Sequence, residues 1–87
     1  MEVIVRKPTE AEKAEAQKWG TWEKEESEFD WQYDEKETCL ILEGKAEIFS
    51  DGKKIAEFGA GDYVVFPQGL SCTWKITKKI RKKYKFS

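Results

Sequence analysis

Short runs in which apolar and polar residues alternate, separated by turns that contain glycine, make up most of this chain. In the clearest run, Phe29, Trp31 and Tyr33 alternate with acidic residues and a glutamine. A period of two is typical of a β-strand with one face in an apolar interior. Further runs predict strands at residues 37–43, 45–50, 53–58, 63–66, 70–76 and 80–86. So many short strands beside a single helical pattern predict an all-β barrel or sandwich.

The one helical pattern lies near the N-terminus, at residues 10–18. Thr9 is a suitable N-cap, and Glu12 three residues later completes a capping box. Gly20 ends the pattern. The alanines of this segment offer little apolar area, so we expect the helix to lie against the sheet and not to form the core.

The length of 87 residues predicts a single domain over residues 1–87. A domain of this size is only marginally stable alone, which favours a partner chain. We therefore expect a homodimer formed through edge strands, in which the segment Glu2–Arg6 pairs across the interface.

The charges nearly balance, with 16 basic and 17 acidic side chains and no histidine. No apolar run is long enough for a signal peptide or a membrane span, so we expect a cytoplasmic protein with no membrane partner. The basic segment at 75–85 alternates with apolar residues, which indicates a strand with a solvated face and not a nucleic-acid site. Abundant lysine and glutamate, without asparagine, are typical of proteins from hot environments.

Two stretches anchored by glycine resemble the two sequence motifs of the cupin superfamily. Glu37 and Gly44 keep the spacing of the first motif, and Gly61, Pro67 and Gly69 fall in register with the second. This resemblance implies a jelly-roll β barrel. With the helical pattern added, the predicted fold is an all-β, cupin-type jelly-roll barrel with one short N-terminal helix.

In metal-binding cupins, the resemblance implies that these motifs supply three histidines and one glutamate as ligands. Here Glu37 remains, while Trp31, Tyr33 and Cys72 stand at the histidine positions. Zinc and the common transition metals usually draw on imidazole or several thiolates. We therefore predict no cofactor and no metal, with a divalent metal held by Tyr33, Glu37 and Cys72 as the alternative.

One branch of the superfamily resembles this chain more closely: the small stand-alone cupins grouped with the cupin domain of ureidoglycine aminohydrolase. The shared features are E-T-C at residues 37–39, the pattern G-D-x-V-x-F-P-x-G-x-x-C-x-W at 61–74, and K-x-Y at 82–84. That enzyme family relies on manganese held by histidines, which have no counterpart here. The resemblance therefore carries over the fold better than the chemistry.

Every second residue of a strand points to the same face of the sheet, and this parity predicts which side chains share the barrel interior. If Glu37 faces inward, as the resemblance implies, Cys39 shares its face. The same alternation places aromatic, thiol and ammonium groups on the inward faces of neighbouring strands. The predicted wall of the ligand pocket consists of Trp31, Tyr33, Cys39, Trp74 and Tyr84.

Three polar side chains are candidates for chemistry in this pocket. A carboxylate that faces a barrel interior needs a partner, so we expect Glu37 to pair with Lys82, a hydroxyl or water. Glu37 would anchor a ligand or act as general acid or base, Lys82 would orient an anionic group, and Cys72 would be a nucleophile. The alternative is structural: Glu37 and Lys82 as an ion pair, and Cys72 as an inert thiol.

Three classes of function remain open at this point. The first is a metal-independent protein that binds a small polar metabolite, with or without catalysis, and we favour it for binding. The second is a metal-dependent hydrolase of the ureidoglycine aminohydrolase type. The third is a structural or interaction module whose pocket is filled by side chains. The sequence does not decide whether the chain is an enzyme.

Overall fold

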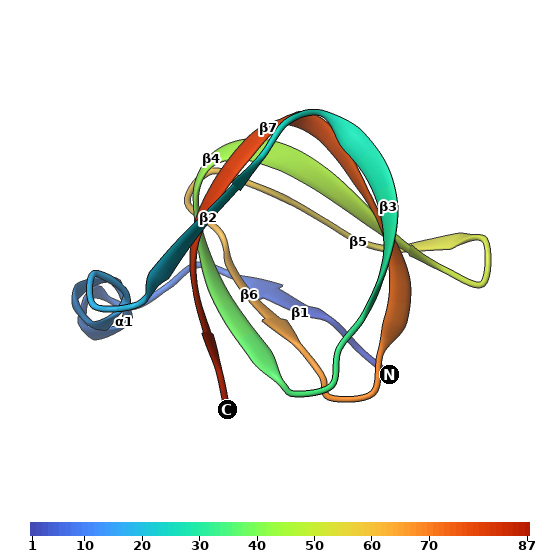
Figure 1. Cartoon of the computed structure of the whole chain (residues 1–87). Helices are drawn as coiled ribbons and strands as arrows, with labels where there is room; N and C mark the ends of the chain where they lie inside the picture. The colour runs from blue at the N-terminus through green and yellow to red at the C-terminus, as the bar shows by residue number, and fades with distance from the viewer.

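Two long strands form the frame of the computed structural model, which describes all 87 residues (Figure 1). β4 (Glu37–Ser50) and β7 (Ser71–Phe86) pair antiparallel, from Glu37 opposite Phe86 to Phe49 opposite Thr73. Each strand pairs with different neighbours at its two ends. The ribbon of β4 and β7 therefore joins two halves of one seven-stranded sheet.

One half of the sheet contains β1 (Ile4–Arg6), β6 (Tyr63–Phe66) and β2 (Gly20–Lys24). β6 pairs with the first residues of β4, and β1 adds to the other edge of β6. β2 pairs with residues 80–84 of β7. All of these pairs are antiparallel, and the strand order of this half is β1-β6-β4-β7-β2, in which no two neighbours are consecutive in the sequence.

The other half contains β3 (Ser27–Gln32) and β5 (Lys53–Gly59). β3 pairs with residues 71–76 of β7, and β5 pairs with residues 45–50 of β4. Figure 1 shows the strands of both halves curving around a common interior, with the hairpin between β4 and β5 extending to one side. The predicted all-β barrel is confirmed.

Buried side chains from both halves meet in one hydrophobic core, because strand alternation turns every second residue inward. β4 and β7 supply about half of it, which follows from their central position in the sheet. The core residues are Val3, Tyr33, Cys39, Ile41, Ala46, Ile48, Phe58, Val64, Phe66, Leu70, Cys72, Trp74, Ile76 and Ile80.

The helix α1 (Glu10–Ala16) lies outside the barrel, as predicted, and ends two residues earlier than expected (Figure 1). The predicted capping box is present: the backbone N–H of Glu12 donates to Thr9 Oγ1 at 3.1 Å, and the backbone N–H of Thr9 donates to Glu12 Oε1 at 2.8 Å. Ala16 is the one buried residue of the helix. With seven residues, α1 is far short of the length that would cross a membrane.

Two predicted strand breaks are wrong. The sequence pattern interrupts the strands at Gly44 and at residues 77–79, but β4 and β7 continue through both places. Gly44 has a φ of 94°, and a Cβ atom there would overlap the backbone oxygen of Lys79. The register of β4 against β7 is irregular between Ile41 and Ala46. Gly44 therefore lets the two strands bend together in close contact, and no turn forms.

The N-terminal segment forms one edge of the sheet. Ile4 lies opposite Val65 of the same chain, so Ile4–Arg6 is a strand of the barrel that pairs on one side only. β6 offers this edge because β4 covers only its other side. The homodimer, and the pairing of the N-terminal segment across its interface, stay predictions.

We expect Gly44→Ala to lower the free energy of unfolding by about 2–4 kcal/mol, because the new methyl group overlaps the backbone of β7 and strains φ. Gly52→Ala is the matched control, since Gly52 has a φ of 76° but open space around it. Strain alone should cost that variant about 1 kcal/mol. Urea unfolding of both variants measures the difference. Equal losses would show that the close approach of β4 and β7 does not set the requirement for glycine.

Candidate functional site

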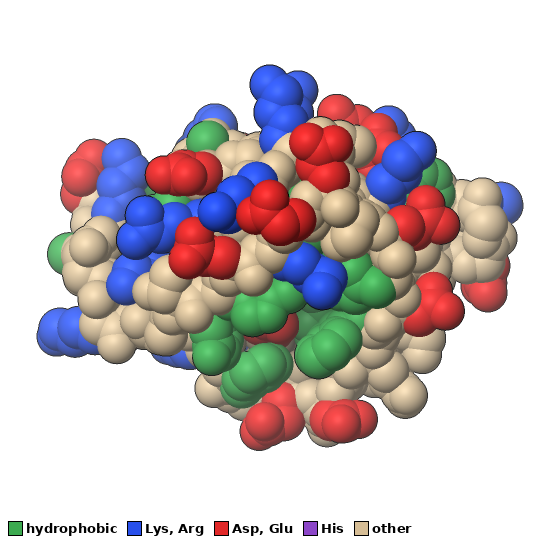
Figure 2. Space-filling model, turned by 45° about the horizontal axis from the view of Figure 1, so that its top comes forward, with side chains coloured by type: hydrophobic (Ala, Val, Ile, Leu, Met, Phe, Trp, Pro, Cys, Tyr) green, Lys and Arg blue, Asp and Glu red, His purple; other side chains and the backbone are tan.

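A pocket of about 230 Å³ opens between the two halves of the sheet. Most of its walls are aromatic, and its charged lining residues are Glu37 and Lys82. Figure 2 shows hydrophobic side chains around a hollow in which an acidic side chain is visible. Strands β2, β3, β4 and β7 all contribute to it. The lining residues are Trp22, Phe29, Trp31, Tyr33, Glu37, Trp74, Lys82, Tyr84 and Phe86.

A buried ion pair lies at the base of this pocket. Lys82 Nζ donates to Glu37 Oε2 at 2.7 Å, and each residue is only 4% exposed. The thiol of Cys39, two residues along β4, donates to the same oxygen at 2.9 Å. Burial raises the pKa of Cys39 well above its ordinary value, so this group remains a protonated donor. Oε2 is thus held by two donors, while Oε1 accepts no hydrogen bond from the chain.

The ammonium of Lys82 also contacts two indole rings. Its Nζ lies 4.7 Å from the ring centre of Trp22 and 4.8 Å from that of Trp74. Trp22 is the direct neighbour of Lys82 across the pair of β2 and β7. The negative faces of the rings attract the ammonium, so they offset part of the cost of removing it from water.

Tyr33 and Trp74 form the wall of the pocket that lies deepest in the core. Trp74 Nε1 donates to the Tyr33 hydroxyl at 3.0 Å, and the Tyr33 ring stacks on Phe66 with centres 4.7 Å apart. Backbone hydrogen bonds to Leu70 and Gly69 fix the chain at Tyr33. Burial, and then the negative charge of Glu37, raise the pKa of Tyr33 far above its usual range. The phenol is therefore a protonated group in a fixed position.

Most of the residues predicted for the pocket do lie in its wall. Trp31, Tyr33, Trp74 and Tyr84 line it together with Glu37 and Lys82, as parity predicted. Trp31 is 49% exposed, which places it at the mouth. Cys39 lies behind Glu37 and does not line the pocket.

Three further aromatic residues line the pocket without having been predicted: Trp22, Phe29 and Phe86. Phe29 shares the face of Trp31, and Phe86 shares that of Tyr84. Strand parity alone could therefore have predicted that these two residues line the pocket. Trp22 enters through the pairing of β2 with β7. Alternation within one strand contains no information on which strand lies beside it, so nothing in the sequence pattern indicated Trp22.

The structure does not bring Cys72 into the pocket with Glu37. Cys72 lines a different hollow, and burial followed by the negative charge of Asp30 raises its pKa to about 11. A reactive thiol needs a neighbouring cation or base that stabilises the thiolate. The environment of Cys72 has the opposite effect, so the geometry favours the structural interpretation of this thiol.

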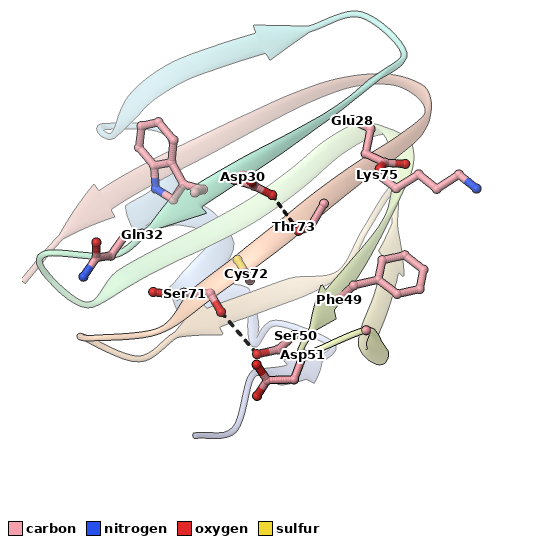
Figure 3. A pocket seen from close by; sticks show the side chains of 12 residues that line it. Glu28, Asp30, Gln32, Phe49, Ser50, Asp51, Ser71, Cys72, Thr73 and Lys75 are labelled. Atoms are coloured by element: carbon pink, nitrogen blue, oxygen red, sulfur yellow. Dashed lines mark hydrogen bonds between the residues drawn. The ribbon is translucent and has the colours of Figure 1, made fainter.

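The hollow that Cys72 borders lies on the outer face of β3 and β7 and has a volume of about 720 Å³ (Figure 3). Outward-facing polar side chains line most of it. Two of its hydrogen bonds connect residues of the sheet itself: Thr73 Oγ1 donates to Asp30 Oδ1 at 2.7 Å, and Ser50 Oγ donates to the carbonyl of Ser71 at 3.2 Å. This is the solvated face of an antiparallel sheet, and the smaller aromatic pocket is the stronger candidate site.

The pocket does not fit a metal of the kind that the cupin motifs imply. No group of three or more cysteine, aspartate or glutamate side chains is arranged to hold a metal ion. Glu37 is the one residue of the ligand motif that this chain keeps, and it has an ammonium 2.7 Å away, which would repel a divalent cation. Tyr33 stands at a histidine position, but it is a protonated phenol and a poor ligand.

Comparison with known proteins shows the family. The chain belongs to the EutQ-like cupin domain family, whose model matches residues 11–84. This finding confirms the predicted cupin superfamily and the cupin type of the barrel. No curated protein matches the chain. The finer resemblance to ureidoglycine aminohydrolase is not among these findings.

Two solved structures are similar to this chain. A DUF861 family protein from Thermotoga maritima is 50% identical, with a TM-score of 0.92 over 99% of this chain and all of that protein. The EutQ protein of Clostridium difficile is 26% identical, with a TM-score of 0.68 over 75% of this chain. The match covers 51% of that protein, so the chain spans about half its length.

We expect Lys82→Met to lower the free energy of unfolding by about 3–5 kcal/mol, because the carboxylate of Glu37 stays buried without its partner. The double variant Glu37→Gln/Lys82→Met removes both charges and should be more stable than Lys82→Met alone. Urea unfolding of the two variants, with the wild type and Glu37→Gln, measures the coupling. A double variant no more stable than Lys82→Met would contradict a coupled ion pair.

The raised pKa of Cys72 predicts a pH dependence of stability. Between its ordinary value of 9.0 and about 11, the unfolded chain loses the thiol proton while the folded chain keeps it. The free energy of unfolding is therefore unaffected by this thiol below pH 9.0, and it falls as the pH rises from there to about 11. The stability of the wild type relative to Cys72→Ala should shrink from pH 9 upward, because the comparison cancels the titration of other groups. A difference that stays constant would show that Cys72 is not desolvated.

Proposed function

We propose that this protein binds a small polar metabolite in the aromatic pocket, and that binding requires no metal. One observation carries the proposal: the interior is not filled by side chains, but keeps a pocket of about 230 Å³ with a carboxylate at its base. A concave, mostly apolar site with a few convergent polar groups is the usual form of a small-molecule site. Glu37 is the polar anchor, and the rings at the mouth enclose the ligand.

The two other classes of function are less well supported. A purely structural module would gain stability by filling the pocket, since a carboxylate that is buried without need is costly. A metal-dependent hydrolase of the ureidoglycine aminohydrolase type needs ligands that this pocket does not offer, and Lys82 lies beside the one carboxylate. We propose binding alone and assign no catalytic step to Glu37 or Lys82.

We infer a cytoplasmic protein that forms a homodimer, with neither nucleic acid nor a membrane as partner. The balanced charge of the chain supports the inference about nucleic acid. The small size of the domain supports the inference about a second copy.

A metabolite library screened by thermal shift, followed by calorimetry on the compounds that stabilise the protein, tests the proposal. Trp31→Ala should weaken binding of these compounds about tenfold, because it removes an exposed ring from the mouth of the pocket. Ile55→Ala is the matched control, since Ile55 is an exposed apolar residue that does not line the pocket. No stabilising compound, or equal effects of both substitutions, would contradict the proposal.

A second arm of the same experiment addresses the metal. Protein purified without an affinity tag is assayed for metal content, and binding is measured before and after dialysis against a chelator. Unchanged affinity supports metal-independent binding. Stoichiometric manganese, together with loss of binding on chelation, would replace the proposal with the hydrolase alternative.

A further inference from the structure

Some polar atoms of the pocket residues make no hydrogen bond within the chain. These atoms indicate which groups a ligand must carry. Glu37 Oε2 accepts from Lys82 and Cys39, but Glu37 Oε1 accepts from nothing in the chain. No fully buried side-chain oxygen or nitrogen lacks a partner in this structure. Oε1 is therefore open to the pocket that Glu37 lines, as an acceptor without a donor.

Tyr33 supplies the complementary group. Its hydroxyl oxygen accepts the indole N–H of Trp74 at 3.0 Å, while its own proton is donated to no atom of the chain. The side chain is nine-tenths or more buried, with the residue 2% exposed, and it lines the pocket. A hydroxyl can donate one hydrogen bond as well as accept. The Tyr33 O–H is thus an unpartnered donor on a residue that lines the pocket.

The charges of the pocket are already balanced. Lys82 is paired with Glu37 at 2.7 Å and lies against the rings of Trp22 and Trp74, so its ammonium is not free for a ligand anion. A ligand cation would displace or be repelled by the same ammonium. A charged ligand would therefore lose its hydration without gaining an opposite charge in return. The pocket favours a molecule without net charge.

The shape of the pocket restricts the ligand further. Its volume of about 230 Å³ is below the range of about 300–1,000 Å³ that is usual for drug-sized ligands. Rings form most of its wall, and a flat ring system stacks well against such surfaces. The space and the walls together suit one or two fused rings.

We propose that the pocket recognises a neutral, flat lactam, whose ring N–H donates to Glu37 Oε1 and whose carbonyl accepts from the Tyr33 hydroxyl. A lactam carries a donor and an acceptor on adjacent ring atoms, so one edge of the ligand satisfies both unpartnered groups. The inference rests on the proposed binding function and adds the chemical class of the ligand. It assigns Tyr33 a direct role in recognition.

Carbostyril, a two-ring lactam, is the probe, and its N-methyl derivative, naphthalene and naphthoate are the comparison compounds. Binding is measured from the indole N–H signals of the tryptophans in heteronuclear NMR spectra, which report on the pocket itself. N-methylation removes the donor to Glu37 and should weaken binding at least about tenfold. Naphthoate, which is charged, should bind more weakly than carbostyril. Equal affinities for carbostyril and N-methylcarbostyril would overturn the lactam assignment.

Tyr33→Phe tests the other contact. It should weaken carbostyril at least about tenfold and leave the affinity for naphthalene unchanged, because naphthalene makes no hydrogen bond. The naphthalene measurement also shows that the pocket of the variant is intact, even though Trp74 loses an acceptor. An equal loss for both compounds would indicate a merely structural role and overturn the assignment to Tyr33.

Failure of this inference is distinguishable from failure of the proposed function. If library compounds bind in a manner that depends on Trp31, but carbostyril does not bind or shows no preference over its derivatives, the pocket functions with another class of ligand. If no library compound binds at all, the proposed function itself is wrong.

Discussion

The antiparallel pairing of β4 with β7 determines where every part of the candidate site lies. β7 passes through both halves of the sheet, and it supplies Trp74 from one half and Lys82 from the other. β4 brings Glu37 next to the second of these. Gly44 allows β4 to approach the backbone of β7 at Lys79, between the part of β7 that carries Trp74 and the part that carries Lys82. β7 supplies four of the nine residues that line the pocket and β4 supplies one, while Tyr33 lies in the loop between β3 and β4.

The ion pair inside the pocket shows how a barrel of this type can keep its central carboxylate without a metal. A buried glutamate requires a positive partner or several donors. The cupin motifs imply histidines and a metal for this purpose, and in this chain Lys82 takes that place with its own charge. The rings of Trp22 and Trp74 and the thiol of Cys39 complete the surroundings of the pair. The positive charge beside Glu37 is thus part of the chain itself, whereas the metal that the cupin motifs imply would come from solution.

The sequence contained enough information for the strands, the helix cap and most of the pocket, because these depend on local patterns. Period-two alternation placed Trp31, Tyr33 and Trp74 on inward faces, and a buried carboxylate predicted the partnership of Glu37 with Lys82. The errors arose where tertiary contacts decide. Gly44 has the sequence pattern of a turn, yet it allows a bend that only the opposite strand explains. Cys72 stands at a ligand position of the motif but borders a separate hollow.

Four strands, β1, β2, β3 and β5, pair on one side only and leave free edges. Such edges are potential templates on which another chain can extend the sheet, which is the first step toward fibrils. β1 is only three residues long, and the longer edges carry charged side chains along their length, such as Glu28 in β3 and Lys53 in β5. Charges and short length at an edge discourage indefinite addition of strands. The barrel can therefore remain open at its sides, with a pocket between its halves, and still resist aggregation.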